Sequence, residues 1–400
     1  AKVVDEVRAH GSCSDVFGRE IGSGPDERCR RAMAEACFLF AAGLCDPSLR
    51  RDDQGPLPVD ARVAQRIEQR RDARALVSRA VARAEPLRKV TIALPARLSL
   101  YHLPLTLADQ LGYFRQAGVA VEWLAHESGA KALNSALQGQ ADVLSGSFEH
   151  LFFLQQKVQG FQAFVQTGRT PQLSLGVSTR PGLVWRSVMD LRGLRVGVSS
   201  LDSATYWMTC HWLMNHGLLP EDVVFVPVGS APQVVEFLRS GAIDALCQPD
   251  PVMHWLEQKN EVRVVFEARS LAATRKLFGG MVPGACLMTT ADFLQRQPER
   301  VQALSDAVVH ALKWLQTAGL TDVLKAVPAG HWLGDRAIYL SAFEKLRESY
   351  AVDGILRSEE VMNAWRAHSR LPNGSALARV VPEKTYTNAF ALKSRVRFSA

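Results

Sequence analysis

The chain has 400 residues, of which 47% are hydrophobic and 22% are charged. This composition is ordinary for a globular protein and excludes a wholly disordered or fibrous chain. The formal net charge is +7, but no block of like charges and no basic stripe gathers it. A solvated basic surface therefore explains the charge better than a nucleic-acid site. No apolar run reaches the length of about 18 residues that a membrane span needs.

The first 87 residues differ in composition from the rest of the chain. Of the 8 Trp, 6 Tyr and 17 Phe residues, only Phe17, Phe38 and Phe40 lie there. Arg70-Arg71, a helix-prone stretch and an Ala-x-Ala ending at Ala84 are typical of a secretory signal, although arginines interrupt the stretch that should be apolar. We expect residues 1–87 to be an export-signal-like or disordered lead. A helical appendage that docks on the body is the alternative.

The seven cysteines do not describe a disulfide framework. Their number is odd, they are spread thinly, and no Cys-x-x-Cys occurs. No paired Cys or His has the spacing of zinc ligands, so we expect neither a metal nor a cofactor. Cys210, Cys247 and Cys286 lie in apolar contexts and are expected to pack as small hydrophobic residues.

From Arg88 onward, short apolar runs alternate with helical stretches. Such alternation predicts a mostly parallel β-sheet that carries helices on its faces. The expected strands cover 90–94, 119–123, 142–144, 161–165 and 173–177, and the expected helices cover 109–117, 130–138 and 148–158.

The alternation begins again at Arg195. The second series has expected strands over 195–198, 223–226, 244–246 and 262–266, and expected helices over 204–215, 232–239 and 251–259. A strand over 285–288 is expected to return to the first sheet, before helices over 298–317, 336–350 and 358–369. In both series a glycine ends a helix and an aspartate, Asp142 or Asp244, opens the next strand. Two matching units predict two lobes with a cleft between them.

The part of the chain after residue 87 also contains a series of short sequence motifs in a definite order. They are Leu111-Gly-Tyr-Phe114, Gly118-Val-Ala-Val-Glu-Trp123, Ser128-Gly-Ala, Leu137-Gln-Gly-Gln-Ala-Asp142, Asp190-Leu-Arg-Gly-Leu-Arg-Val-Gly197, Gly217-Leu-Leu-Pro-Glu-Asp222, Ser240-Gly-Ala-Ile-Asp244, Pro249-Asp-Pro251 and Tyr386-Thr-Asn-Ala-Phe390. Together they resemble the periplasmic solute-binding proteins of ABC importers, in the branch that serves alkanesulfonates, taurine, nitrate and thiamine pyrimidine precursors. The resemblance covers roughly residues 88–395.

This resemblance implies the type II periplasmic-binding fold, in which two α/β lobes joined by crossing strands close on a ligand. The division expected for this chain is 88–180 for the first part of lobe 1, 181–280 for lobe 2, and 281–400 for the return strand and C-terminal helices. The resemblance also implies an exported, periplasmic protein whose partners are a small solute and the membrane subunits of an ABC permease. We further expect a monomer without a nucleic-acid partner.

The implied function is capture of an alkanesulfonate- or taurine-like solute for import. Binding of a thiamine pyrimidine precursor or another small heterocycle is the alternative, as is an enzyme of the pyrimidine-precursor synthase type on the same fold. The sequence lacks the Cys-rich motif of those synthases, and it contains no G-x-S-x-G, P-loop, G-x-G-x-x-G or H-E-x-x-H motif. We therefore expect no catalytic residues.

Ligands of open α/β sheets bind beyond the carboxyl ends of the strands, so the loops after strands supply the candidate site residues. An ordinary packed loop, a helix cap or a core aromatic is the alternative at each position. In the first lobe the candidates are Ser99, Tyr101 and His102 after the first strand, and Gly146, Ser147 and Phe148 after the third.

The second lobe offers a run of small hydroxyl residues over 199–205, between a strand and a helix. Such a turn presents backbone N–H groups and hydroxyls to an anion at the positive end of the helix. A helix cap by Asp202 or Ser203 is an equally simple explanation. The resemblance implies that the matching segment contacts ligand, which makes Ser199, Ser203, Ala204 and Thr205 candidates.

Asp250 lies between two prolines, after the strand that holds Asp244. The resemblance implies that it hydrogen-bonds an amino or hydroxyl group of the ligand, and a turn-stabilising role is the alternative. The hydroxyl-rich helix start favours an oxyanion, whereas Asp202, Asp250 and the nearby aromatic residues favour a neutral or cationic ring. The residues alone leave this choice open.

Overall fold

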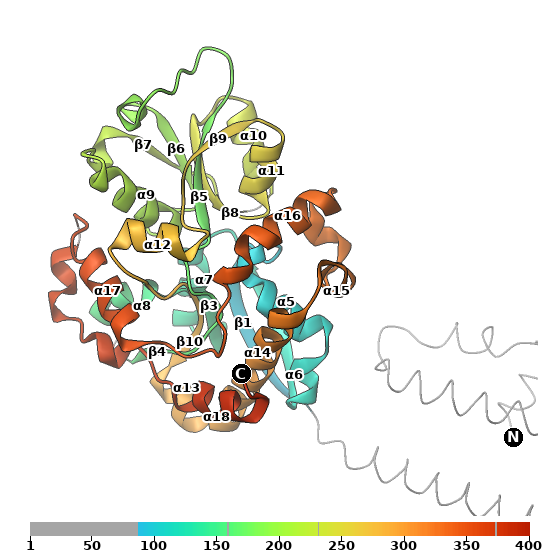
Figure 1. Cartoon of the computed structure of the whole chain (residues 1–400). Coiled ribbons are helices and arrows are strands. Elements are labelled where there is room, and N and C mark those ends of the chain that lie inside the picture. The colour runs from blue at the N-terminus through green and yellow to red at the C-terminus, as the bar shows by residue number, and fades with distance from the viewer. Residues whose placement is uncertain (1–86, 158–159, 231, 373) are drawn as a thin grey trace, which may run out of the picture. The chain divides into compact units, whose positions relative to one another are not determined.

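Two five-stranded sheets organise the computed structural model, which describes residues 87–157, 160–230, 232–372 and 374–400 (Figure 1). These residues belong to one unit that begins at Glu85. The expectations for residues 1–87 fall outside the described residues, except at Leu87. In the described part of the chain, no helix has the length and apolarity that a membrane span requires.

The first sheet has the order β2-β1-β3-β10-β4 and the second has the order β7-β6-β8-β5-β9. In each sheet the first three strands run parallel and the fourth is antiparallel to both neighbours. The strands of the first sheet are β1 (Arg88–Pro95), β2 (Val119–His126), β3 (Val143–Ser147), β4 (Phe161–Gln166) and β10 (Ala285–Thr290). Those of the second are β5 (Leu173–Ser178), β6 (Arg195–Val198), β7 (Val224–Pro227), β8 (Ala245–Pro249) and β9 (Val262–Glu267).

The reversed strands, β5 and β10, are the two that follow a crossing from one sheet to the other. The return of β10 to the first sheet is therefore confirmed. β5, by contrast, lies within the range 88–180 expected for lobe 1, yet it pairs with β8 and β9 in the second sheet. Every residue of β5 is buried, and an apolar run of this kind does not reveal which sheet it joins.

The two segments of chain that cross between the sheets are in direct contact. Gly284 donates its N–H to the carbonyl oxygen of Gly168 at 3.0 Å. A Cβ at position 284 would lie 2.0 Å from the carbonyl oxygen of Thr170, so only glycine fits at this point between the sheets.

Helices cover both sheets, and C-terminal helices reach the second lobe, where α16 packs against α11 and α12 packs against α9 and α17 (Figure 1). The helices before β10 are η1 (Leu100–His102), α5 (Leu103–Gln110), α6 (Tyr113–Gln116), α7 (Gly129–Leu137), α8 (His150–Lys157), η2 (Val188–Leu191), α9 (Ala204–Asn215), η3 (Pro220–Asp222), α10 (Val234–Arg239), α11 (Val252–Gln258) and α12 (Leu271–Phe278). Those after it are α13 (Ala291–Arg296), α14 (Pro298–Thr317), α15 (Leu320–Ala326), η4 (Ala329–Trp332), α16 (Arg336–Leu346), η5 (Arg347–Ser349), α17 (Ser358–His368), η6 (Gly374–Arg379), η7 (Pro382–Thr385) and α18 (Ala389–Phe398).

The expected helix over 109–117 is wrong in its position. The chain forms α5 and α6 instead, and Gly112 separates them with a φ of +73°. Pro104 lies in the first turn of α5, where its missing N–H is not needed and its fixed φ favours the helix. The helix therefore begins earlier than the apolar pattern indicates.

The repeated aspartate forms the same contact in both lobes. Asp142 accepts the N–H of Thr91 at 2.9 Å and donates its own N–H to the Thr91 carbonyl oxygen. Asp244 makes the same pair of bonds with Arg195, at 2.8 Å in each direction. In each lobe the aspartate thus fastens the start of its strand to the neighbouring strand.

Candidate ligand-binding site

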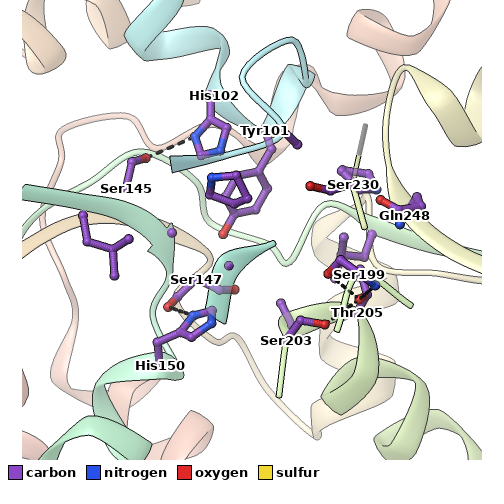
Figure 2. Close-up of a pocket in the computed structure, with 18 residues that line it drawn as sticks. Tyr101, His102, Ser145, Ser147, His150, Ser199, Ser203, Thr205, Ser230 and Gln248 are labelled. Atoms are coloured by element: carbon purple, nitrogen blue, oxygen red, sulfur yellow. Dashed lines mark hydrogen bonds between the residues drawn. The ribbon is translucent and has the colours of Figure 1, made fainter. Parts of the chain in front are cut away.

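An inner cavity of about 60 Å³ lies where the carboxyl ends of strands from the two sheets meet (Figure 2). Its volume suits a compact chemical group, since a buried water needs about 10–15 Å³ on the same kind of measure. It is lined by Pro95, Ala96, Tyr101, His102, Gly129, Leu144, Ser145, Gly146, Ser147, His150, Leu173, Ser199, Ser203, Ala204, Thr205, Ser230, Gln248 and Pro249.

His150 begins α8 on the first-lobe side of the cavity, across from Ser203 (Figure 2). Its Nδ1 lies 3.0 Å from the carbonyl oxygen of Ser147. Because a carbonyl only accepts, Nδ1 carries the proton and the Nε2 of the neutral ring is an acceptor. Burial lowers the pKa of His150, which favours the neutral ring. Nε2 is buried and has no partner among the described residues.

Tyr101 and His102 form the opposite part of the first-lobe wall. The Nδ1 of His102 lies 3.1 Å from the Ser145 hydroxyl, while its Nε2 is buried without a partner in the described structure. Burial, aided by the positive charge of Arg97, lowers the pKa of His102 to about 3, so its ring is neutral. The buried hydroxyl of Tyr101 points toward Ser147 in Figure 2 and has no hydrogen-bond partner within the described chain. Burial raises the pKa of Tyr101, which keeps the hydroxyl protonated.

The second lobe contributes a connected group of hydroxyls. Thr205 Oγ1 accepts the N–H of Ser199 at 2.9 Å and lies 3.0 Å from Ser199 Oγ and 2.7 Å from Ser203 Oγ. Ser203 is also the N-cap of α9 and accepts the N–H of Tyr206 at 3.4 Å. These hydroxyls therefore hold the turn together while they face the cavity.

Three helices, α7, α8 and α9, direct their N-terminal ends at the cavity, through Gly129, His150 and the pair Ala204–Thr205. Among the described residues, no hydrogen bond uses the N–H of Ala204 or Thr205. Helix N-termini carry partial positive charge and free N–H groups, so this arrangement favours a negatively charged or strongly accepting group. Among the described residues, the lining contains no Lys, Arg, Asp or Glu side chain.

An outer cavity of about 320 Å³ continues from the inner one and shares Ala96, Ser230, Gln248 and Pro249 with it. Unlike the inner cavity, it includes charged side chains, namely Arg97, Glu127 and Asp250, among its lining residues. The buried Nε2 of His126, which also lines it, has no partner among the described residues. The outer cavity thus offers space for the part of a solute that extends beyond the compact group.

The chain matches the family model described as NMT1/THI5 like over residues 99–318, more than half of its length. It belongs to the NMT1/THI5-like family. No curated protein sequence matches it. A solved structure from Bordetella bronchiseptica RB50 is 36% identical, with 79% of this chain and 99% of that chain covered and a TM-score of 0.75.

Two more distant structures share the fold of this NMT1/THI5-like chain. One is the alkanesulfonate-binding protein SsuA from Xanthomonas axonopodis pv. citri bound to MOPS, at 16% identity, with 76% of this chain and 99% of that chain covered and a TM-score of 0.59. The other is the periplasmic nitrate-binding protein NrtA from Synechocystis PCC 6803, at 13% identity, 78% and 89% coverage and a TM-score of 0.63. These matches confirm the periplasmic-binding fold with its two α/β lobes.

Most of the predicted site residues of this NMT1/THI5-like chain meet at the inner cavity. Ser99, Phe148 and Asp250 do not. Phe148 is fully buried and packs edge-to-face on Phe152, with ring centroids 5.5 Å apart, because it points into the core of the first lobe. The residues that line the inner cavity are Tyr101, His102, Gly146, Ser147, Ser199, Ser203, Ala204 and Thr205.

Asp250 lines the outer cavity, but its carboxylate is committed to Arg269. The two buried side chains form a bidentate ion pair, with Nε–Oδ2 and Nη2–Oδ1 distances of 2.7 and 2.8 Å. Ser99 is also committed to a hydrogen bond within the protein, because its hydroxyl donates to the Asp250 carbonyl oxygen at 2.8 Å. Ser99 thereby links the first lobe to the second.

Sequence reasoning missed several polar lining residues, namely Ser145, His150, Ser230 and Gln248. Ser145 has a signal in the sequence, because it precedes Ser147 by two positions and side chains two apart share one face of a strand. His150 lies one helical turn after Ser147, within the expected helix. Ser230 and Gln248 reach the cavity only through tertiary structure, and no local pattern marks them.

Proposed function

We propose that this NMT1/THI5-like protein is the solute-binding component of an ABC importer. It captures a small solute with an oxyanion group, of the alkanesulfonate or taurine type, in the periplasm and presents it to the membrane permease. One observation carries the proposal: a cavity lined from both lobes that gathers three helix N-termini with buried polar atoms of Tyr101, His102 and His150 that have no partner among the described residues.

The helix N-termini at the site support an anionic group. Free N–H groups at a helix N-terminus stabilise an anion without a cationic side chain, and the lining residues that the structure describes include no Lys or Arg. The Tyr101 hydroxyl adds a donor, because its raised pKa keeps it protonated. The inner cavity suits a compact head group such as a sulfonate, and the outer cavity of about 320 Å³ suits the remainder of the molecule.

In this proposal the protein makes and breaks no bond. The described cysteines do not supply a reactive thiolate, because burial raises the pKa of Cys210 and Cys247 to about 12 and also raises that of Cys286. No group of three potential metal ligands occurs among the described residues. Function then consists of a shift between open and closed populations on binding.

A small neutral heterocycle, such as a thiamine pyrimidine precursor, is the second candidate solute. It is favoured by the uncharged lining and by the neutral rings of His102 and His150, which suit the N–H groups and ring nitrogens of a heterocycle. The two candidates differ in whether the free N–H groups of α9 carry the affinity.

Ala204→Pro tests this difference directly. Ala204 is the first residue of α9, where proline suits the backbone and removes only an N–H that the helix does not use. Ser358→Pro is the matched control, at the first residue of α17. Each protein is unfolded and refolded to remove bound solute, and its affinity for ethanesulfonate, taurine, nitrate and an aminopyrimidine is measured by calorimetry.

We expect the wild type and Ser358→Pro to bind a sulfonate, and Ala204→Pro to bind it at least about tenfold more weakly, as expected when a hydrogen bond to a charged group is lost. Binding of the aminopyrimidine alone would replace the first candidate with the second. Binding of none of the probes, with no rise in Tm at saturating concentrations, would refute both.

A further inference from the structure

His150 presents a lone pair to the inner cavity, and the structure fixes that orientation. Its Nδ1–H donates to the Ser147 carbonyl oxygen at 3.0 Å, so Nε2 carries no proton in the neutral ring. Turning the ring over would break this bond and bury an unpaired carbonyl. His150 is 3% exposed, and no side chain or backbone group among the described residues donates to Nε2.

The surroundings of His150 hold the ring in place. Trp207 packs against it edge-to-face, with ring centroids 5.1 Å apart. Gly129 lies on another side, where a Cβ would come within 3.2 Å of both Cε1 and Nε2. The charges that act on the ring do not protonate it, because burial outweighs the carboxylate of Asp202 and lowers the pKa of His150.

We propose that His150 is a specificity-determining residue that selects solutes carrying an N–H or O–H donor beside their anionic group, and disfavours bare oxyanions and unsubstituted alkanesulfonates. This inference rests on the proposed function and deepens it by naming the solute class: amino- or hydroxy-substituted sulfonic acids. The helix N-termini bind the acid group, and Nε2 accepts the hydrogen bond of the amino or hydroxyl group.

The preference follows from the cost of leaving a buried acceptor unpaired. A solute that donates to Nε2 restores the hydrogen bond that the atom loses when water leaves the cavity. A solute with a methyl group or an anionic oxygen at that position leaves the lone pair unpaired or repels it. A hydrogen bond that is lost in this way reduces affinity by about tenfold, and by more when the donor is an ammonium group.

Three probes of one carbon skeleton test the inference: ethanesulfonate, 2-hydroxyethanesulfonate and 2-aminoethanesulfonate. The measured quantity is the ratio of the Kd for ethanesulfonate to the Kd for each substituted probe, by calorimetry on the refolded full chain. In the wild type we expect a ratio of at least about ten. In His150→Phe, which keeps the aromatic packing on Trp207 but has no acceptor, we expect a ratio near one.

His368→Phe is the matched control. His368 is buried in the same aromatic cluster, its Nδ1 lies 2.8 Å from the Ala364 carbonyl oxygen, and it does not line the inner cavity. The same replacement there should leave the ratio at its wild-type value. His150→Gln supplies an acceptor oxygen near the position of Nε2 and should retain a ratio well above one.

A measurement on the wild type removes the dependence on folded variants. Nitrogen-15 NMR of the complex with 2-hydroxyethanesulfonate should show the Nε2 of His150 as an unprotonated nitrogen. A protonated Nε2, or a wild-type ratio near one, overturns the role of His150 and leaves the proposed function intact. If no sulfonate binds to any of these proteins, the proposed function fails, and this inference fails with it.

Discussion

The two lobes face the inner cavity with polar side chains of different kinds. The first lobe presents Tyr101, His102 and His150, each with a buried polar atom that has no partner in the described structure. The second lobe presents Ser199, Ser203 and Thr205, whose hydroxyls bond to one another and to the turn that carries them. Side chains whose hydrogen bonds are all formed within the protein fix the shape of a site. Side chains with an unpaired donor or acceptor select which solute binds there.

We therefore expect the paired hydroxyls of the second lobe to contribute to the stability of the fold. We expect the open polar groups of the first lobe to determine which solute binds. Substitutions of paired groups in the second lobe should reduce the free energy of unfolding, because they leave a buried partner without a hydrogen bond. Substitutions of the open groups in the first lobe should reduce solute affinity and leave stability unchanged. Substitutions in each lobe test this division.

Asp250→Asn should destabilise the protein by about 3 kcal/mol, because it removes one partner of a buried ion pair and leaves Arg269 poorly compensated. Solute affinity should stay within about twofold of the wild type, since the carboxylate is committed to Arg269 at 2.7 and 2.8 Å. Urea unfolding and calorimetry measure the two quantities. Glu267→Gln is the control, because this half-exposed partner of Arg269 should contribute less than about 1 kcal/mol. A large loss of affinity without loss of stability would restore Asp250 as a ligand residue.

Thr205→Val should cost about 2 kcal/mol of stability, because the isosteric change leaves the buried N–H of Ser199 without its acceptor. Thr274→Val is the control. Its hydroxyl donates to the Ser270 carbonyl oxygen, which also accepts the N–H of Thr274 and so remains paired after the substitution. The control should lose less than about 1 kcal/mol in the same urea titration. Equal losses in the two variants would contradict the view that the hydroxyl group organises its turn.

The sequence predicts the architecture well where helix ends carry local signals. α9 begins where expected, because Ser203 caps its N-terminus, and α14 begins at Pro298 as expected. The short sequence motifs that resemble those of the family predict the two lobes. The sheet that β5 joins could not be predicted, because a fully buried strand has no pattern that distinguishes one sheet from another.

The site is predicted only in part, for a physical reason. Hydroxyl residues at strand-to-helix turns are visible in the sequence, and eight of the eleven candidates line the inner cavity. Whether a polar atom is open or paired depends on distant partners. Arg269, which binds Asp250, lies 19 positions away. The sequence therefore suggests Asp250 and His102 equally, and only the structure separates a paired carboxylate from an open imidazole.

Asp142 and Asp244, which occupy matching positions in the two lobes, also differ in their contacts. Both fasten a strand, but Asp244 also pairs with the guanidinium groups of Arg180 and Arg195, so its replacement removes more. Asp244→Asn should destabilise by about 2 kcal/mol and Asp142→Asn by less than about 1 kcal/mol, because the amide oxygen still accepts the backbone N–H in each. Urea unfolding of both variants at neutral pH measures this difference.

At acid pH, the extra stability that the ion pairs of Asp244 contribute should be lost. Although burial raises its pKa, the hydrogen bonds and charge of Arg195 and Arg180 lower it overall, below the ordinary value of 3.8. A carboxyl group with a lowered pKa stabilises the fold above its unfolded pKa and loses that contribution as the pH falls through its folded pKa. The stability gap between wild type and Asp244→Asn should therefore shrink below about pH 4. A gap that is constant from neutral pH to acid would show that the ion pairs contribute nothing.

Tyr101→Phe should have the smallest effect on stability, within about 0.5 kcal/mol, because the hydroxyl that it removes leaves no unpaired partner among the described residues. Solute affinity should fall by about tenfold, since the protonated hydroxyl is a side-chain donor that the first lobe offers to an anion. Tyr350→Phe is the matched opposite. Its buried hydroxyl donates to the Leu100 carbonyl oxygen at 3.0 Å, so removing it should cost about 1 kcal/mol of stability and leave affinity unchanged. If Tyr101→Phe lost stability and kept its affinity, the first lobe would be as fully paired as the second, and selection of the solute would have to come from the backbone N–H groups alone.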